Sequence, residues 1–256
     1  MLDQKRKVAS VANPWVRGLV RAAYIAKKDA KVYYFKAPNL TYGLIVPIFL
    51  FLAFSVGVKM EPAFLVTGLT ALSILFSTTS IEAVSVVLEK EKGTFERLLT
   101  APVSMFTVVF GKALAGVLFG LIISLVLLVP SLILLQSLPN PLLVLVAIAM
   151  SSLTFSSLGV LVSSFARWVP EAQMLSNFIR FPMAFASGVF IPLESMTSSL
   201  QMFARLLPLT YSVDALRQTI AGPFVLEPFL IDLLSMTLFS AAFLMIAAKV
   251  LEKKTG

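Results

Sequence analysis

The chain contains no cysteine and no histidine, and these two absences exclude several kinds of chemistry. Without cysteine there is no disulfide framework and no thiolate nucleophile. Without histidine there is no imidazole base, which excludes the six-span serine–histidine intramembrane proteases. Neither residue is available to ligate zinc, haem or an iron–sulfur cluster. We therefore expect no catalytic residue, no metal site and no cofactor site in this chain.

Charged residues are scarce as well. They make up 13% of the 256 residues, whereas hydrophobic residues make up 58%. Soluble domains carry about a quarter charged residues, and a transmembrane helix needs about 20 mostly apolar ones. Six stretches reach that length, at about residues 40–58, 62–88, 103–135, 141–164, 172–191 and 228–250. The sequence predicts an all-α integral membrane protein, with a six-span transmembrane domain over residues 39–251 and a cytoplasmic N-terminal arm over residues 1–38.

The positive charges are distributed unevenly between the two sides of this predicted bundle. The formal net charge is +8, and seventeen of the 21 lysines and arginines fall on one side. Because cytoplasmic loops carry the excess of lysine and arginine, that side is predicted to be cytoplasmic. Six spans then place both termini in the cytoplasm of a multi-pass protein of the cell membrane. In a membrane protein such charge indicates topology and anionic lipid, so no nucleic acid partner is expected.

Residues 14–36 of the N-terminal arm have the pattern of an amphipathic helix. Apolar residues fall on one face: Trp15, Leu19, Ala22, Ala26 and Tyr33. Basic residues fall on the opposite face: Arg17, Arg21, Lys28 and Lys31. The pattern predicts an elbow helix that lies on the cytoplasmic leaflet. The alternative is a mobile basic tail.

The connection between the second and third predicted spans, residues 88–102, is charged but carries apolar residues at helical spacing. Phe95, Leu98 and Leu99 would share one face of a short amphipathic helix, and Thr94 is available as its cap after Gly93. A solvated loop has no need of three large apolar residues. They dock either on the protein's own membrane-proximal surface or on a partner.

A second informative segment, residues 194–222, follows the fifth predicted span. Four apolar residues have roughly helical spacing at its start: Met196, Leu200, Phe203 and Leu207. Pro208 interrupts the run, which resumes over residues 211–220. The pattern predicts two short re-entrant helices on the external side, and the alternative is a simple interfacial lid. Asp214 and Arg217, three residues apart, are placed to pair on one helix face.

Three features inside the predicted spans carry further expectations. Arg180 lies near the membrane midplane, where an unpaired charge is costly, so we expect it to face a cavity, an interface or an acidic partner; a local structural pairing is the alternative. Glu82 falls about 30 Å along the second helix, at the cytoplasmic interface, where its carboxylate would snorkel to water. Gly116 and Gly120 form a Gly-x-x-x-Gly face, which we expect to allow close helix packing within the subunit rather than between copies.

Two motifs resemble the signature of ABC type-2 transport permeases, the membrane subunits of exporters for drugs, lipids, polysaccharides and lipo-oligosaccharides. The first is Glu91-Lys-Gly-Thr-Phe-Glu-Arg-Leu-Leu-Thr-Ala-Pro-Val, followed by Gly111-Lys112. The second is Phe185-Ala-Ser-Gly-Val-Phe-Ile-Pro-Leu-Glu-Ser-Met, followed by Leu207-Pro-Leu-Thr-Tyr and Asp214-Ala-Leu-Arg. The resemblance covers roughly residues 15–250, and it is specific to the family rather than to a substrate.

The resemblance implies roles for both motifs. The first would be a coupling helix that docks on a separate ATPase subunit through Glu91, Lys92, Gly93, Thr94, Phe95, Glu96, Arg97, Leu98 and Leu99. The second would form an external gate, which gives these candidates for the translocation path or gate: Arg180, Gly188, Pro192, Pro208, Tyr211 and Arg217. The implied partners are two copies of the ABC ATPase, a second copy of this permease or a related permease, and membrane lipid.

The chain itself lacks a nucleotide-binding motif. A P-loop needs a glycine five residues before its Gly-Lys pair, and Phe106 stands at that position before Gly111-Lys112. We therefore expect the partner ATPase to bind the ATP and magnesium. The chain would be a non-catalytic permease that exports a hydrophobic or amphipathic substrate of the drug, lipid or glycan-lipid class. Truncation of Phe95 or Leu98 would then weaken its association with the ATPase.

The alternative function is a stand-alone secondary transporter or channel. Proteins of that class commonly use intramembrane carboxylates or histidines for ion coupling. The embedded acids here are only Glu82 and Asp232, both near the ends of predicted spans. A scaffold role is a third possibility, which co-purification with an ATPase that depends on this chain would separate from the permease.

Overall fold

The computed structural model describes residues 14–33, 41–55, 61–95, 103–135 and 140–255, and the prediction of an all-α protein is confirmed within these ranges. In chain order the elements are α2 (Pro14–Tyr33), the π-helical turn η1 (Thr41–Ile45), α4 (Val46–Ser55), α5 (Pro62–Glu91), α7 (Met105–Leu135), α8 (Pro141–Phe165), α9 (Val169–Ala186), the 3-10 turn η2 (Leu193–Ser195), α10 (Ser198–Ala204), α11 (Pro208–Ile220) and α12 (Leu226–Thr255). No strand occurs in the described ranges.

Within the described residues, four helices are long and apolar enough to cross a membrane: Pro62–Glu91, Met105–Val129, Pro141–Phe165 and Leu226–Lys254. They correspond to the second, third, fourth and sixth predicted spans. The first predicted span is divided between η1 and α4, and its last residues lie outside the described ranges. The fifth corresponds to α9, an 18-residue helix that carries Glu171 and Arg180. A total of six spans stays a prediction.

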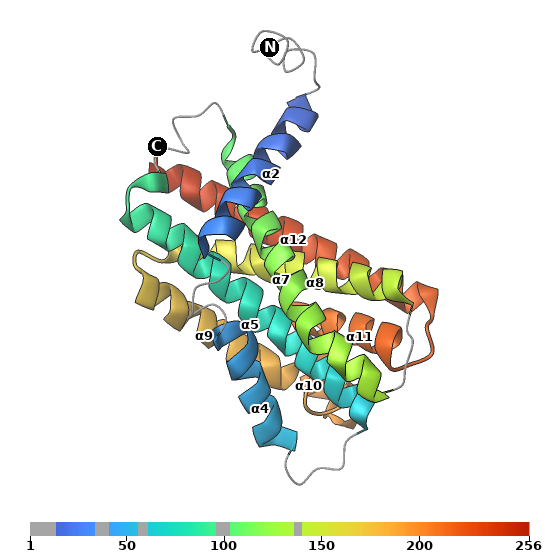
Figure 1. Cartoon of the computed structure of the whole chain (residues 1–256). Coiled ribbons are helices and arrows are strands. Elements are labelled where there is room, and N and C mark those ends of the chain that lie inside the picture. The colour runs from blue at the N-terminus through green and yellow to red at the C-terminus, as the bar shows by residue number, and fades with distance from the viewer. Residues whose placement is uncertain (1–13, 34–40, 56–60, 96–102, 136–139, 256) are drawn as a thin grey trace.

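Helix α5 is the central helix of the bundle, and it is surrounded by α7, α8, α9 and α11 (Figure 1). Nearly every residue between Thr67 and Glu89 is buried, although many of them are serine or threonine. Their hydroxyl groups bond mostly within α5: Thr70 Oγ1 donates to the Val66 carbonyl at 2.7 Å, and Thr78 Oγ1 donates to that of Ile74 at 2.7 Å. Most of the buried hydroxyl groups of this polar interior helix are therefore satisfied within the protein, with Ser73 Oγ as an exception.

Close contacts at glycine hold α5, α7 and α8 together. A Cβ atom added to Gly116 would lie 2.6 Å from Ser156 Cβ of α8, and one added to Gly120 would lie 2.6 Å from Thr78 Cγ2 of α5. A Cβ on Gly159 of α8 would meet the Thr79 carbonyl oxygen of α5 at 2.7 Å. The expectation that the Gly-x-x-x-Gly face packs within the subunit is confirmed.

The ends of the helices follow ordinary capping chemistry. Proline occupies the first or second position of α5, α8, α9 and α11, where a missing N–H costs little. Asn140 caps α8 because its side-chain oxygen accepts from the Leu142 N–H at 3.0 Å. Helices α5, α8 and α12 end where α9 begins, and we call this the α5 end of the bundle; α10 and α11 lie toward the opposite end, the α11 end (Figure 1).

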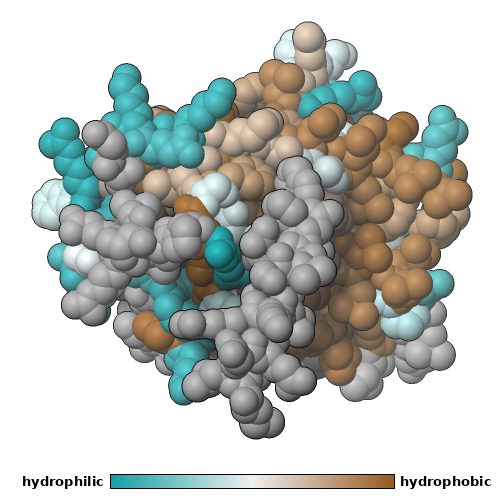
Figure 2. Space-filling model, turned by 90° about the horizontal axis from the view of Figure 1, so that it is seen from above, coloured by the Kyte–Doolittle hydropathy of each residue, from teal (hydrophilic) through white to brown (hydrophobic). Residues whose placement is uncertain are grey.

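The outer surface of the bundle is apolar. Helix α12 exposes a row of large side chains, among them Leu230, Leu234, Leu238 and Met245. Figure 2 shows a broad hydrophobic area beside a region in which hydrophilic residues gather. Only 28% of the apolar window of α12 is buried, against 89% of that of α5, so α12 presents its face to lipid.

Candidate functional site

The described part of the predicted docking segment is the turn that ends α5. Glu91, Lys92, Gly93 and Thr94 are exposed, and Gly93 has φ 66°, the left-handed conformation that commonly ends a helix. Thr94 Oγ1 donates to the Glu89 carbonyl at 3.3 Å. The predicted cap at Thr94 would involve N–H groups of residues after Phe95, which lie outside the described ranges, so it stays a prediction. Four predicted docking residues lie outside the described ranges: Glu96, Arg97, Leu98 and Leu99.

Phe95 faces inward. Its side chain is 3% exposed and joins a cluster of buried residues from five helices, including Val86, Met105, Val109 and Leu251. The position of Phe95 agrees with the alternative prediction, in which Phe95 docks on the protein's own surface. In this structure Phe95 fixes the turn to the bundle, so among the described residues of the segment the exposed ones, Glu91 to Thr94, are available to a partner.

A cluster of four charges lies directly behind this turn. Lys112 Nζ of α7 lies 2.6 Å from Glu89 Oε2 and 2.8 Å from Asp29 Oδ2. Lys28 Nζ of α2 lies 2.5 Å from Glu89 Oε1 and 3.0 Å from Asp29 Oδ1. The side chains of Lys112, Asp29 and Glu89 are 1%, 2% and 3% exposed, so the cluster ties α2, α5 and α7 together in a nearly dry setting. Burial alone would lower the pKa of Lys28, but the hydrogen bond to Glu89 and the two carboxylate charges raise it.

The sequence reasoning missed this cluster because it treated Lys28 and Lys112 only as topological charges. A signal was present in α2, where Asp29 lies one turn after Ala26 and two after Ala22. All three are buried against α7, whereas Leu19, which was predicted to share that face, is 58% exposed. The helical character of α2 is confirmed, and its place on the leaflet stays a prediction.

Gly111 explains how α2 comes so close to α7. A Cβ atom at this position would lie 2.9 Å from the Ala22 carbonyl oxygen and 3.0 Å from Ile25 Cβ. Only glycine leaves room for the α2 backbone there. The Gly111-Lys112 pair of the first motif thus combines a close crossing with the lysine that binds Asp29.

Two further residues at the end of α5 bond to other helices. Lys90 Nζ donates to the Ser163 carbonyl at 2.7 Å, at the end of α8. Glu91 Oε1 accepts from the Val169 N–H at 3.0 Å, at the start of α9. Lys254 Nζ of α12 donates to the Ser164 carbonyl at 2.8 Å and so completes the cap of α8.

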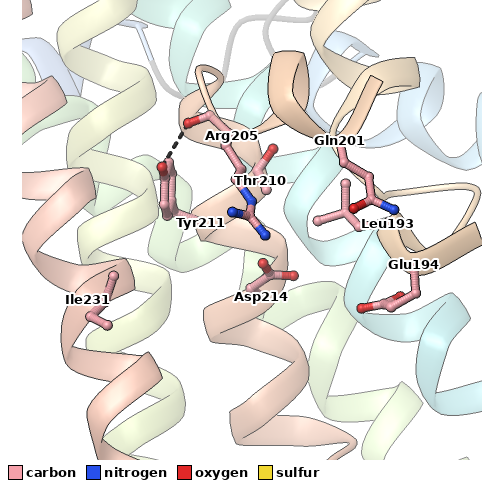
Figure 3. Close-up of a pocket in the computed structure, with 8 residues that line it drawn as sticks. All are labelled: Leu193, Glu194, Gln201, Arg205, Thr210, Tyr211, Asp214 and Ile231. Atoms are coloured by element: carbon pink, nitrogen blue, oxygen red, sulfur yellow. Dashed lines mark hydrogen bonds between the residues drawn. The ribbon is translucent and has the colours of Figure 1, made fainter. Parts of the chain in front are cut away.

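At the α11 end, a cavity of about 420 Å³ opens between η2, α10, α11 and α12 (Figure 3). It is lined by Leu193, Glu194, Gln201, Arg205, Thr210, Tyr211, Asp214 and Ile231. The Tyr211 hydroxyl donates to the Arg205 carbonyl at 2.7 Å, and the Arg205 side chain extends toward Asp214. Burial raises the pKa of Asp214 to about 6, Arg217 and Arg205 oppose this, and Glu194 adds to it.

Arg217 is bound in a different way from the one predicted. Its Nη2 donates to the Gly188 carbonyl at 2.5 Å, and its guanidinium lies 4.0 Å from the centre of the Phe64 ring. No ion pair joins Arg217 to Asp214 in the described chain. The expected side-chain pairing on one helix face is therefore wrong, because the guanidinium reaches across to Gly188, two residues after the end of α9. Gly188 has φ 80°, which favours glycine.

The predicted break between two short helices is confirmed at Pro208. Helix α10 ends at Ala204, and Pro208 begins α11. Pro192 stands immediately before η2. Pro208, Tyr211 and Arg217 therefore belong to one helix, and the structure places only Tyr211 of these three on the lining of the 420 Å³ cavity.

Arg180 lies inside the subunit. It is fully buried and donates to several neutral oxygens, among them the Phe76 carbonyl at 3.1 Å, Ser80 Oγ at 2.5 Å, Asn177 Oδ1 at 3.0 Å and Gln173 Oε1 at 3.4 Å. Its guanidinium also lies 5.0 Å from the centre of the Phe76 ring. These contacts correspond to the alternative of a local structural pairing between α9 and α5.

Glu82 does not snorkel to water. It is 1% exposed, and Ser85 Oγ donates to its carboxylate at 3.2 Å. Gly116 and Gly159 of the neighbouring helices lie so close that an added Cβ would contact the Glu82 side chain at 3.2 and 3.0 Å. The prediction that Glu82 snorkels to water is wrong, because α7 and α8 enclose this part of α5.

Comparison with known families gives a match over most of the chain. The family described as ABC-2 type transporter matches residues 18–221, which run from α2 to the end of α11. This range includes the turn after α5, the charge cluster and every lining residue of the cavity at the α11 end except Ile231.

Three relatives illustrate the similarity. Nodulation protein J of Rhizobium leguminosarum bv. viciae is 28% identical over 170 residues, which are 62% of this chain and 62% of that protein. ABC transporter G family member 20 of Dictyostelium discoideum is 33% identical over 159 residues, 60% of this chain and 21% of that protein. Inner membrane transport permease YhhJ of Escherichia coli (strain K12) is 27% identical over 153 residues, 59% of this chain and 40% of that protein. The chain thus spans less than two thirds of the length of each of these relatives.

Proposed function

The chain belongs to the ABC-2 type transporter family, and from this premise we propose that it is the permease subunit of an ATP-driven exporter. Membership makes it a membrane transport component. ATP-driven export, the ATPase partner and the substrate class are our proposals. The substrate would be hydrophobic or amphipathic, of the drug, lipid or glycan-lipid class, because the bundle offers it a largely apolar environment.

The observation that carries the proposal is the exposed turn Glu91 to Thr94. It projects from the end of the interior helix of the bundle, and all four of its residues are exposed, although Glu91 also accepts from the Val169 N–H and Thr94 donates to the Glu89 carbonyl. The chain has no P-loop, so ATP and magnesium would be bound by a separate ABC ATPase, in two copies that dock on two copies of the permease or on one copy and a related permease.

We place the α5 end in the cytoplasm, together with both termini. The lysine-rich end of α12 and Arg167 lie at this end of the bundle, in agreement with the positive-inside rule. Completion of six spans would need the region of η1 and α4, and also α9, to cross the membrane. Reporters inserted near Lys92 and after Lys254 should then read cytoplasmic, and one near Ser198 should read external.

The function is tested by co-expression with the cognate ABC ATPase. We expect the two proteins to co-purify, and ATP hydrolysis in proteoliposomes to depend on the permease. Lys92→Glu should weaken co-purification, whereas Lys249→Glu, at an exposed lysine of α12, should not. Transport by the permease alone, driven by an ion gradient, would instead establish the stand-alone secondary transporter.

A further inference from the structure

Three consecutive residues at the end of α5 bond to three different parts of the bundle. Glu89 pairs with Lys112 of α7 and Lys28 of α2. Lys90 donates to the last turn of α8, and Glu91 accepts from the first N–H of α9. Successive residues of a helix point about 100° apart, so three in a row reach three directions. The turn that follows them is exposed and has been assigned above to the ATPase.

The contact of Glu89 is the strongest of the three. Lys112 is enclosed by two carboxylates, and its removal would leave Glu89 and Asp29 buried beside each other with only Lys28 between them. Separating a buried pair in this way is far more costly than losing a pair at the surface. Any displacement of Glu89 must therefore carry α7 and α2 with it.

Glu91 accepts a hydrogen bond from the Val169 N–H, a group that has no acceptor within its own helix. The first N–H groups of a helix have no acceptor within the helix, and a carboxylate there is favoured by the helix dipole. Glu91 supplies that acceptor to α9 from outside. Helix α9 then runs 18 residues, about 27 Å at 1.5 Å per residue, past Arg180 to Gly188, whose carbonyl binds Arg217 of α11.

We propose that Glu89, Lys90 and Glu91 form a joint that couples the docking turn to α2, α8 and α9, with Lys112 as the positioning residue of its α2 arm. The inference rests on the proposed function, because the joint would matter when an ATPase displaces the turn. Through the α9 arm the displacement reaches the Gly188–Arg217 contact at the opposite end. In this proposal Glu89, Lys90, Glu91 and Lys112 act by positioning the helices to which they bond.

The joint can be tested without any transport assay, since the chain has no cysteine. Spin labels at Lys27→Cys and Lys92→Cys, both exposed, report the distance from α2 to the turn in the purified permease by pulsed electron paramagnetic resonance. Lys112→Met should broaden the distance distribution, and Lys112→Arg should restore most of it. Lys249→Met is the matched control at an exposed lysine and should leave it narrow. A narrow distribution in a folded Lys112→Met protein would overturn the α2 arm.

The α9 arm is tested at an exposed residue whose substitution leaves the core intact. With labels at Lys92→Cys and Met174→Cys, Glu91→Ala should broaden the distribution, and Glu91→Gln, which keeps an acceptor for the Val169 N–H, should not. Glu227→Ala is the control at an exposed acid in the first turn of α12. Identical distributions for Glu91→Ala and the wild type would overturn this arm.

Transport gives the functional readout. In the reconstituted complex, Lys112→Met and Glu91→Ala should lower the substrate moved per ATP hydrolysed by about tenfold, within the usual range of coupling between two sites. Retention of the ATPase should stay unchanged in Lys112→Met, because Lys112 is buried behind the docking turn and is not part of it. An unchanged ratio would show that the joint is only structural. A wild-type complex without ATP-driven transport would refute the proposed function, whereas the label distances decide the joint independently.

Discussion

Where α5 ends, Lys112 lies within 2.8 Å of two carboxylates and is 1% exposed; at the α11 end, Glu194, Arg205 and Asp214 line a cavity and no ion pair joins them. The first arrangement fixes three helices against one another. The second leaves charged side chains beside about 420 Å³ of open space. The contrast teaches that this bundle concentrates its tight polar contacts at the end proposed to bind the ATPase, and keeps room at the end proposed as the gate.

Lys112→Met tests the difference between the two ends most directly, because it removes the buried cation of the α5 end. We expect the free energy of unfolding to fall by about 3–5 kcal/mol, the range for removing one partner of a buried ion pair. Thermal unfolding of the purified permease in detergent measures the effect. Lys249→Met should change little, because Lys249 is exposed. Equal melting temperatures for the two variants would mean that the buried charges at the α5 end are not held as described.

Phe95→Ala examines the same end through packing. Because Phe95 is 3% exposed, we expect a loss of roughly 3 kcal/mol in the isolated permease, before any partner is added. This differs from the expectation for a residue that serves only as an anchor for a partner. Phe49→Ala is the control, since Phe49 is 68% exposed on α4. A wild-type melting temperature for Phe95→Ala, with weakened ATPase retention, would restore the anchor interpretation.

Gly159→Ala tests how tightly α5 and α8 are packed against each other. The new Cβ would lie 2.7 Å from the Thr79 carbonyl oxygen, so the α5 or α8 backbone must move. We expect a destabilisation of about 1–3 kcal/mol. Gly18→Ala is the matched control: its nearest neighbour would be Thr107 Oγ1 at 3.7 Å, and the change should be neutral or slightly stabilising. Similar melting temperatures would show that α5 and α8 can separate freely.

The smallest expected effect is the pH dependence of stability that Asp214 causes at the α11 end. Its pKa is raised to about 6 by burial, so the folded state binds a proton that the unfolded state has lost between about pH 4 and pH 6. Stability should therefore fall as the pH rises through 6, by about 1–2 kcal/mol once screening by the open cavity is included. The melting temperature of the wild type, followed from pH 4 to pH 7, should show this slope, and that of Asp214→Asn should not. Parallel profiles would contradict it.

Local pattern predicted much of the fold. Helices α5, α7, α8 and α12 coincide with long apolar runs. Such runs can be recognised from the local sequence alone, without knowing which helices pack against them. The break at Pro208 was equally predictable, since proline cannot continue the preceding helix. The π-helical start at Thr41 had no comparable signal in the sequence.

The partners of charged residues could not be predicted in the same way. The second motif suggested Arg217, but nothing local says that it binds the Gly188 carbonyl rather than Asp214. Glu82 was placed by counting along one helix, which gives depth but not enclosure by neighbouring helices. Asp29 and Lys112 are far apart in sequence, so their pairing depends on how α2 crosses α7. Such contacts belong to the tertiary arrangement, and a single sequence does not specify them.

The crossing of α2 over α7 at Gly111 also sets an order of events during synthesis. The chain emerges from its N-terminus, so Asp29 is made 83 residues before Lys112. At a translation rate of roughly 5–20 residues per second, Asp29 of α2 is synthesised roughly 4 to 17 seconds before Lys112. The exposed Leu19 and Tyr24 give α2 a surface for resting against lipid during that interval. Nascent chains arrested before residue 112 should therefore leave α2 open to protease, and chains arrested well beyond it should protect α2.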